Sequence, residues 1–244
     1  MSERDAWHRL ASLTPARLAL GRSGNGLPTA RVLEFQLAHA QARDAVQRPS
    51  DAKAVATGLD RPDTRLVTTE ATDRQIYLMN PDAGRRLSEA SRESLARGDY
   101  DAVLVIADGL SSTAIDAHGA ALARLVLAGL PKLKFAPVVI VTGGRVAIGD
   151  DIAQAVGAQL AIVLIGERPG LSAADSVGIY LTFAPRPGVT TDSDRNCISN
   201  VRPGGLALED AAHRLAWLVT EARKRRLTGI ELKDDAPDLR GITS

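Results

Sequence analysis

The stretch Asp101-Ala-Val-Leu-Val-Ile-Ala-Asp108 decides the fold of this 244-residue chain. Six consecutive apolar residues between two acids are typical of a strand that is covered on both faces in a parallel sheet. Gly109-Leu-Ser-Ser112 then breaks the run, and apolar residues recur at helical spacing from Ser112 to Gly129. A strand, a tight turn and a helix in this order form the first half of a βαβ unit, whose ligands lie beyond the carboxyl ends of the strands. The turn over residues 108–112 is therefore the first place to look for function.

The same pattern recurs downstream and upstream of this stretch. Residues 137–142 and 161–165 are further candidates for buried strands, and each runs into a glycine turn. If the strands are parallel, Asp108, Gly144, Val146 and Glu167 meet along one rim of the sheet. The other expected elements are strands at residues 65–69 and 177–183, helices at 73–79, 80–98, 148–156 and 206–226, a helix start at 172–175, and an irregular polar segment at 184–205. The sequence thus predicts an α/β protein with a mostly parallel sheet flanked by helices.

Residues 1–60 differ from the rest and predict an N-terminal helical arm. Thr14-Pro15 has the form of a helix start that ends before the glycine-rich residues 21–28. Residues 30–46 predict a second helix, with apolar side chains on more than one face. A helix of this kind needs cover on several sides, so the arm either meets a partner or packs within its own chain.

Charge, cysteine content and hydropathy exclude several classes of protein. Lys and Arg number 30 against 29 Asp and Glu, so the net charge of +1 indicates neither a nucleic-acid nor a membrane-surface partner. The single cysteine excludes an internal disulfide and any multi-cysteine metal site. No apolar run approaches the ~20 residues that a bilayer span requires. We therefore expect a cytoplasmic protein that binds neither nucleic acid nor membrane.

The polar residues near the turns leave several kinds of chemistry open. Asp108 can act as a general base, hold a ligand hydroxyl or cap its own turn. Ser111 and Ser112 can hold an anionic group at a helix start or simply cap that helix. Cys197 has no histidine near it in the sequence, which favours a small contact residue over a nucleophile. One reading of these residues is a stand-alone nucleotide-binding transferase that uses Asp108 and the turn at 143–144, and another is a purely structural subunit.

Six segments are too long and too particular to be generic features of α/β proteins. They are TPARLALGR (14–22), FQLAHAQARD (35–44), ADGLS (107–111), RVAIG (145–149), IGERPG (165–170) and RNCISNVRPG (195–204). In this order, and over nearly the whole chain, they resemble the light (small) subunit of ethanolamine ammonia-lyase. His118 follows Asp116-Ala, the opening of the cobalt-ligating signature of some cobalamin proteins, but position 121 is Ala, so we do not expect a metal ligand there.

The resemblance implies an adenosylcobalamin enzyme that converts ethanolamine to acetaldehyde and ammonia by radical chemistry. The heavy (large) subunit is expected to carry the substrate residues, while this chain covers the cofactor at the interface between the two. By the family's motifs the cofactor contacts carry over to Val146, Glu167 and Cys197. Val146 would offer apolar surface to the corrin, Glu167 would accept hydrogen bonds from amide arms or the ribose, and Cys197 would fill a tight contact.

The resemblance also has implications for organisation and location. It implies that residues 61–244 form a Rossmann-like domain that contacts cobalamin, and that the arm, residues 1–60, contacts the heavy subunit. A higher hetero-oligomer of light and heavy chains follows. The expected location is the cytoplasm, and a bacterial microcompartment within it remains an open alternative.

Overall fold

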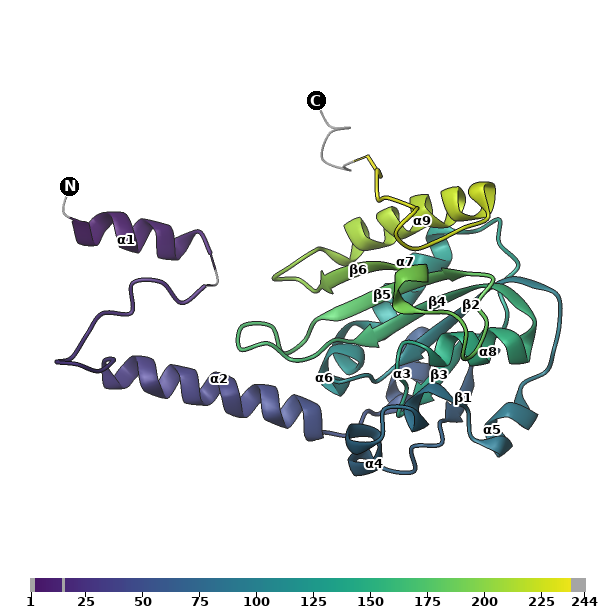
Figure 1. Cartoon of the computed structure of the whole chain (residues 1–244), viewed down its shortest axis with the longest axis horizontal. Helices are drawn as coiled ribbons and strands as arrows, with labels where there is room; N and C mark the ends of the chain where they lie inside the picture. Colours follow the sequence, from purple (N-terminus) through teal and green to yellow (C-terminus); the bar gives the residue numbers. More distant parts are fainter. Residues whose placement is uncertain (1–2, 15, 238–244) are drawn as a thin grey trace.

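The computed structural model describes residues 3–14 and 16–237, which leaves out Met1, Ser2, Pro15 and the last seven residues of the chain. The protein is an α/β structure in which one six-stranded sheet is flanked by helices (Figure 1). The strand order is β1-β3-β2-β4-β5-β6. The strands are β1 (Arg65–Thr68), β2 (Tyr100–Ala107), β3 (Val139–Thr142), β4 (Ala158–Gly166), β5 (Val177–Phe183) and β6 (Asn196–Val201).

The sheet is mixed. Strands β1, β3, β2 and β4 are parallel, whereas β5 is antiparallel to β4, and β6 is antiparallel to β5. The expected strand at 101–108 is confirmed as β2, whose residues 102–107 are fully buried. Strands β3 and β4 lie on opposite sides of β2, so the direction of winding reverses there. In such sheets the crevice beside the reversal is the usual ligand site.

Each face of the sheet has its own core. On one face, helices α3 (Ala52–Leu59), α7 (Ala120–Gly129) and α9 (Leu208–Arg225) pack against alternate strand residues. On the other face, the main cover is α8 (Ile148–Val156), together with Leu87 and Leu95. The helix expected from Ser112 is present as α6 (Ser112–Ala114), a π-helical segment η2 (Ile115–Gly119) and α7. The α/β class and the helices on both faces are therefore confirmed.

Three local predictions for residues 80–205 are wrong. Instead of one helix at 80–98, the structure has two short ones, the 3₁₀ helix η1 (Ala83–Arg85) and α5 (Glu89–Ser94). The helix is interrupted because the Leu87 N–H donates to Asp151 Oδ2 at 2.8 Å and not to a carbonyl of the preceding turn. No helix begins at 172–175, since the link from β4 to an antiparallel neighbour needs no crossover helix. The segment 184–205 is not irregular throughout, because it contains the 3₁₀ helix η3 (Asp192–Asp194) and β6. The helix α4 (Arg74–Met79), in contrast, lies where it was expected.

The arm contains the helices α1 (Glu3–Ser12) and α2 (Thr29–Gln47), which project away from the sheet in Figure 1. The expected helix at 30–46 is confirmed as α2. A helix after Thr14-Pro15 is wrong for the described residues 16–22, where Ala19 has a φ of 54°. Helix α3 also lies within residues 1–60, yet its Val55 and Leu59 belong to the core. The boundary near residue 60 stays a prediction.

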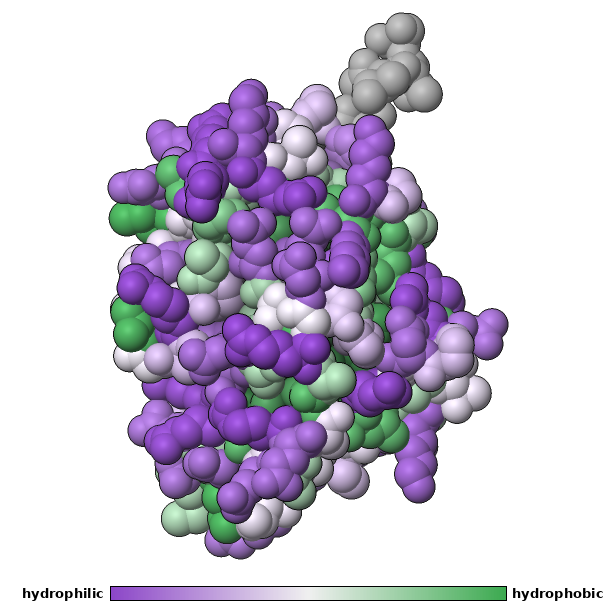
Figure 2. All heavy atoms as spheres, turned by 90° about the vertical axis from the view of Figure 1, so that its right-hand side faces the viewer, coloured by the Kyte–Doolittle hydropathy of each residue, from purple (hydrophilic) through white to green (hydrophobic). Residues whose placement is uncertain are grey.

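Exposed apolar side chains gather on the arm. Of the fifteen large exposed hydrophobic side chains in the described part of the chain, nine lie between Trp7 and Leu37. The face turned away from the arm is mostly hydrophilic, with small separate hydrophobic patches (Figure 2). Arg17 Nη2 donates to the carbonyl of Leu171 at 3.2 Å, which joins the arm to the loop between β4 and β5. Among the described residues, no helix combines the length and the apolar character needed to cross a bilayer.

Candidate functional site

Asp108 lies at the carboxyl end of β2, beside the reversal of winding, and organises the rim of the sheet. Its side chain is 5% exposed and accepts hydrogen bonds from the backbone N–H groups of Gly109, Gly143 and Gly144 at 2.9–3.1 Å. Burial raises the pKa of Asp108, against the opposing effect of these donors and of Arg74. Asp108 caps its own turn through the Gly109 N–H, as one of the predicted interpretations requires. It also holds the turn after β3 in place through Gly143 and Gly144, which the sequence did not predict.

Ser111 and Ser112 also hold backbone segments together. Ser111 Oγ caps α6 by accepting from the Ala114 N–H at 3.2 Å and donates to the Ala174 carbonyl at 2.6 Å. Ser112 Oγ donates to the Arg48 carbonyl at 2.7 Å. Both side chains are buried. The contacts support capping and tethering, and they leave neither hydroxyl directed at an anionic ligand.

Val146 and Glu167 line the same pocket, which has a volume of about 430 Å³. Val146 comes from the turn between β3 and α8, and Glu167 directly follows β4. The pocket is completed by Tyr77, Leu110, Arg145, Ile165, Gly166, Arg168 and Tyr180. Val146 and Arg145 also line a neighbouring pocket of about 410 Å³ that reaches Asp192 and Arg195. Val146 and Glu167 meet in this pocket, and Asp108 accepts a hydrogen bond from the Gly144 N–H in the turn that leads to Val146. The expected meeting of these four residues along one rim is therefore confirmed.

Glu167 is partly committed to the protein. Its Oε2 accepts from the Asn200 N–H at 3.1 Å, which ties the end of β4 to β6. A Cβ at Gly178 would lie 3.2 Å from Oε1, tighter than an ordinary contact, so glycine leaves that oxygen its space. No hydrogen bond to Oε1 is found among the described residues. One carboxylate oxygen thus remains to accept a donor from a ligand.

Cys197 does not line the pocket itself but adjoins it through Tyr180. It lies on β6 opposite Tyr180 of β5, is exposed, and has its Sγ 3.2 Å from Ser199 Oγ. Burial raises the pKa of Tyr180, and the neighbouring Cys197 and Glu167 raise it further. Ile179 and Ile198 belong to the core beneath α9, so the alternation of strand side chains puts Tyr180 and Cys197 on the opposite face. Val146 and Glu167 therefore share a pocket with Tyr180, and Cys197 lies beside Tyr180 on the same face of the sheet.

Comparison with known proteins identifies the family. A family model described as ethanolamine ammonia-lyase light chain (EutC) matches residues 4–233. Proteins named ethanolamine ammonia-lyase small subunit from Xanthomonas campestris pv. campestris (strain B100) and Azotobacter vinelandii are each 50% identical to this chain. These alignments cover 96% and 94% of this chain, and 89% and 88% of the relatives. The chain belongs to the ethanolamine ammonia-lyase light-chain family.

A protein of the same name from Pseudomonas aeruginosa (strain UCBPP-PA14) is 49% identical over 245 residues. The light-chain family match includes every residue of the rim described above. It also includes Tyr77, Arg145, Arg168 and Tyr180, which sequence reasoning did not assign to the site. Arg145 and Arg168 stand beside Val146 and Glu167 in two of the quoted segments, and that adjacency was a usable signal. Tyr180 gave no signal, because its place depends on the pairing of β5 with β6.

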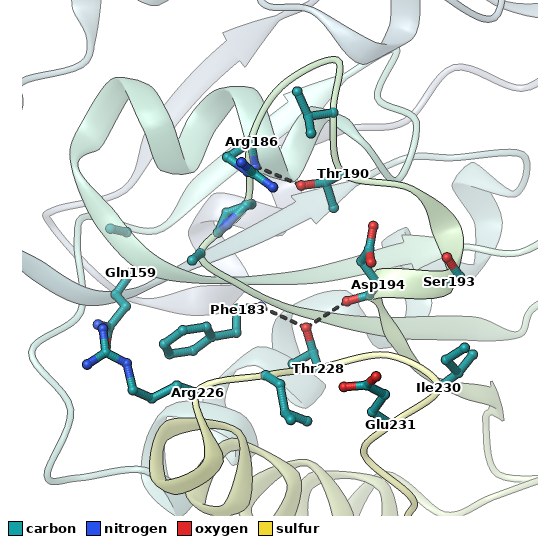
Figure 3. Close-up of a pocket in the computed structure, with 15 residues that line it drawn as sticks. Gln159, Phe183, Arg186, Thr190, Ser193, Asp194, Arg226, Thr228, Ile230 and Glu231 are labelled. Atoms are coloured by element: carbon teal, nitrogen blue, oxygen red, sulfur yellow. Dashed lines mark hydrogen bonds between the residues drawn. The ribbon is translucent and has the colours of Figure 1, made fainter.

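A larger cavity of this light-chain family member lies elsewhere. It has a volume of about 890 Å³ and is found where β4 begins and β5 ends, with Gln159, Phe183, Arg186, Arg226 and Glu231 among its lining residues (Figure 3). Thr228 Oγ1 bridges this region by donating to the Asp194 carbonyl at 2.6 Å and accepting from the Phe183 N–H at 2.9 Å. Val146, Glu167 and Cys197 are not among its lining residues. Size alone therefore does not select the candidate site.

Proposed function

We propose that this chain is the light subunit of an adenosylcobalamin-dependent ethanolamine ammonia-lyase, which converts ethanolamine to acetaldehyde and ammonia. The observation that carries the proposal is that Val146 and Glu167 line one pocket and that Tyr180 connects this pocket to Cys197. These are the three positions at which the family's motifs lead us to expect cofactor contacts. Membership of the light-chain family gives the proposal its substrate and its reaction.

The donor and acceptor groups of the rim suit a cobalamin edge. Val146 presents apolar surface, Oε1 of Glu167 is a free acceptor, and Nε of Arg145 is a buried donor without a hydrogen-bond partner in the described structure. Cobalamin is larger than an ordinary pocket ligand, so a pocket of about 430 Å³ takes only part of it. The remaining surface of the cofactor would face the large subunit, in agreement with a site shared between two chains.

The residues present support a division of labour between the two chains. Adenosylcobalamin supplies, when bound, the carbon radical that abstracts hydrogen from the substrate. In this chain Val146 would pack on the corrin, Glu167 would accept a hydrogen bond from an amide arm or the ribose, and Cys197 would fill a close contact. The rim carboxylate of Asp108 is occupied by backbone donors, so this chain binds and covers while substrate chemistry falls to the heavy subunit.

The proposal extends to assembly and location. Membership in a small-subunit family implies a large partner subunit, and the exposed apolar side chains of the arm support a contact there. A higher hetero-oligomer, a cytoplasmic location and entry into a bacterial microcompartment are proposed from the family resemblance alone. The Rossmann-like designation is proposed on the four parallel strands and the reversal at β2. The stand-alone transferase is not favoured, because its key residue, Asp108, is committed to the turn at Gly143 and Gly144.

A titration of the two-chain complex tests the proposal. The light chain is co-expressed with its heavy subunit, and cobalamin binding is followed in the visible spectrum. Glu167→Ala should raise the dissociation constant roughly 10-fold, because it removes an acceptor from the pocket, and the complex should still assemble. Glu231→Ala, an exposed change in the cavity of Figure 3, is the matched control and should leave the constant unchanged. Equal affinity of the Glu167→Ala variant and the unaltered complex would remove Glu167 from the site.

A further inference from the structure

We propose that Arg145 and Arg168 form an anion subsite that binds the phosphodiester of the cobalamin nucleotide loop. This inference rests on the proposed function and deepens it, since it assigns one chemical group of the cofactor to two residues of this chain. Both arginines line the pocket of about 430 Å³ that contains Val146 and Glu167.

Arg145 is held in position by the protein before any ligand arrives. Its backbone N–H donates to the Gly84 carbonyl at 2.7 Å, and its Nη2 donates to the Tyr77 carbonyl at 2.8 Å. Its guanidinium lies over the Tyr77 ring, 4.1 Å from the centroid. A Cβ at Gly84 would come within 2.8 Å of the Arg145 Cγ, so glycine makes room for the side chain. A side chain fixed in this way loses little conformational entropy when it binds a ligand.

The guanidinium of Arg145 is incompletely partnered by the described residues. The Nε of Arg145 is buried and has no hydrogen-bond partner in the described structure. Neither Arg145 nor Arg168 takes part in an ion pair with another described residue. A buried donor without an acceptor is unfavourable, and an acceptor supplied by a ligand would relieve this. This is the feature that distinguishes Arg145 from an ordinary surface arginine.

The pocket as a whole favours a ligand with negative charge. Two guanidinium groups face one carboxylate, and Oε2 of that carboxylate, on Glu167, already accepts from the Asn200 N–H. Arg168 is exposed, directly follows Glu167 and lines the same pocket as Arg145. Guanidinium groups bind phosphate oxygens through paired, charge-assisted hydrogen bonds.

The phosphodiester is the group of cobalamin that fits this chemistry. The side arms of the corrin are neutral amides, which Glu167 and backbone groups can satisfy. The nucleotide loop adds a single negative charge at a fixed distance from the ring. Cobinamide has the same corrin but lacks the nucleotide and its phosphate, so it separates contacts to the ring from contacts to the loop.

Equilibrium titration of the light–heavy complex with both corrinoids is the test. Arg145→Gln and Arg168→Gln should each weaken cobalamin binding roughly 10-fold or more and change cobinamide binding by less than about two-fold. Arg145→Lys, which keeps the charge, should recover part of the loss. Arg186→Gln, an exposed arginine of the cavity in Figure 3, is the control and should alter neither affinity. Inorganic phosphate should compete with cobalamin and not with cobinamide.

The contrary outcomes are distinct from one another. Equal weakening of both corrinoids by Arg168→Gln would overturn the subsite, because the arginine would then act on the ring or on the fold. Unchanged cobalamin affinity in both glutamine variants would also overturn it. Phosphate that binds without displacing cobalamin would mean that the arginines bind a free anion. If the unaltered complex binds neither corrinoid, the proposed function itself fails.

Discussion

Arg195 and Asp150 form a fully buried ion pair that connects the start of α8 with the segment directly before β6. Arg195 Nη1 and Nη2 donate to the two carboxylate oxygens of Asp150 at 2.7 and 2.6 Å, and both side chains are 2% exposed. Nη1 also donates to Thr182 Oγ1 at 2.9 Å. Asp150 lies in the first turn of α8, just after Val146, and Arg195 stands just before Cys197. The pair therefore fixes the spacing between two proposed cofactor contacts.

Removal of one partner of this pair should destabilise the fold strongly. Arg195→Met leaves a buried carboxylate without its cation, so we expect the free energy of unfolding to fall by about 3–5 kcal/mol in urea denaturation. The double variant Arg195→Met with Asp150→Leu should recover most of this loss, since no buried charge remains. Arg223→Gln breaks the exposed pair with Asp101 and should lower stability by less than about 1 kcal/mol. A loss below that level for Arg195→Met would contradict this account.

Tyr77 should make stability fall in alkaline solution. Burial raises the pKa of Tyr77 to about 12, from about 10 in the unfolded chain. Between these values the unfolded state releases the phenolic proton and the folded state keeps it, so the stabilisation present below pH 10 is lost as pH rises. The unfolding free energy of the unaltered protein, compared with Tyr77→Phe, should drop by about 1.4 kcal/mol between pH 9 and pH 11. Parallel curves for the two proteins over this range would exclude a raised pKa for Tyr77.

Gly166 should tolerate no side chain. A Cβ at this position would collide with the carbonyl oxygens of Ser111 and Asp108, at the point where β4 passes the turn after β2. Because these atoms belong to the backbone and cannot rotate away, Gly166→Ala should destabilise the protein by about 3 kcal/mol. Gly170→Ala, which has only ordinary contacts with Ala173, is the control. Similar thermal midpoints for the two variants would show that the turn is looser than described.

The exposed apolar side chains of α2 should contribute to binding the heavy subunit. Leu33 is 58% exposed, so Leu33→Ser should change the unfolding free energy of the light chain by less than about 0.5 kcal/mol. The same change should weaken association with the heavy subunit roughly 10-fold in a titration of the two chains, because it removes apolar contact area. Ile230→Ser, at an 80% exposed position of the cavity in Figure 3, should affect neither quantity. Association that is insensitive to Leu33 would place the heavy subunit elsewhere.

How far the fold could be predicted depended on how each strand is covered. Strand β2 was predictable because both of its faces are buried and its sequence is apolar without interruption. Strand β6 was missed because it is an edge strand with one covered face, so only Ile198 and Val201 are buried within it. The antiparallel turn from β4 to β5 was missed because a strand followed by a polar loop does not by itself reveal the direction of the next strand.

The candidate site was predictable in part, and for a different reason. Val146 and Glu167 follow strand ends, and their meeting at one pocket depended only on parallel strands with crossover helices. Cys197, by contrast, rested on the family resemblance, since its strand was not expected. Tyr180, which connects it to the pocket, depends on the register of two antiparallel strands. Such a register is set by packing across the whole sheet, and a linear pattern does not contain it.

The hydrogen bond from Arg17 to the Leu171 carbonyl connects the arm, the proposed contact surface for the heavy subunit, with the loop that follows Glu167. Leu171 lies only a few residues after Glu167, in a loop whose base is held by the Ser176 carbonyl and by Ser111. If the heavy subunit binds the arm as proposed, its binding would also restrain the loop that follows Glu167. If both proposed contacts hold, docking of the heavy chain and binding of the coenzyme would each favour the other, because the coupling between two sites is reciprocal.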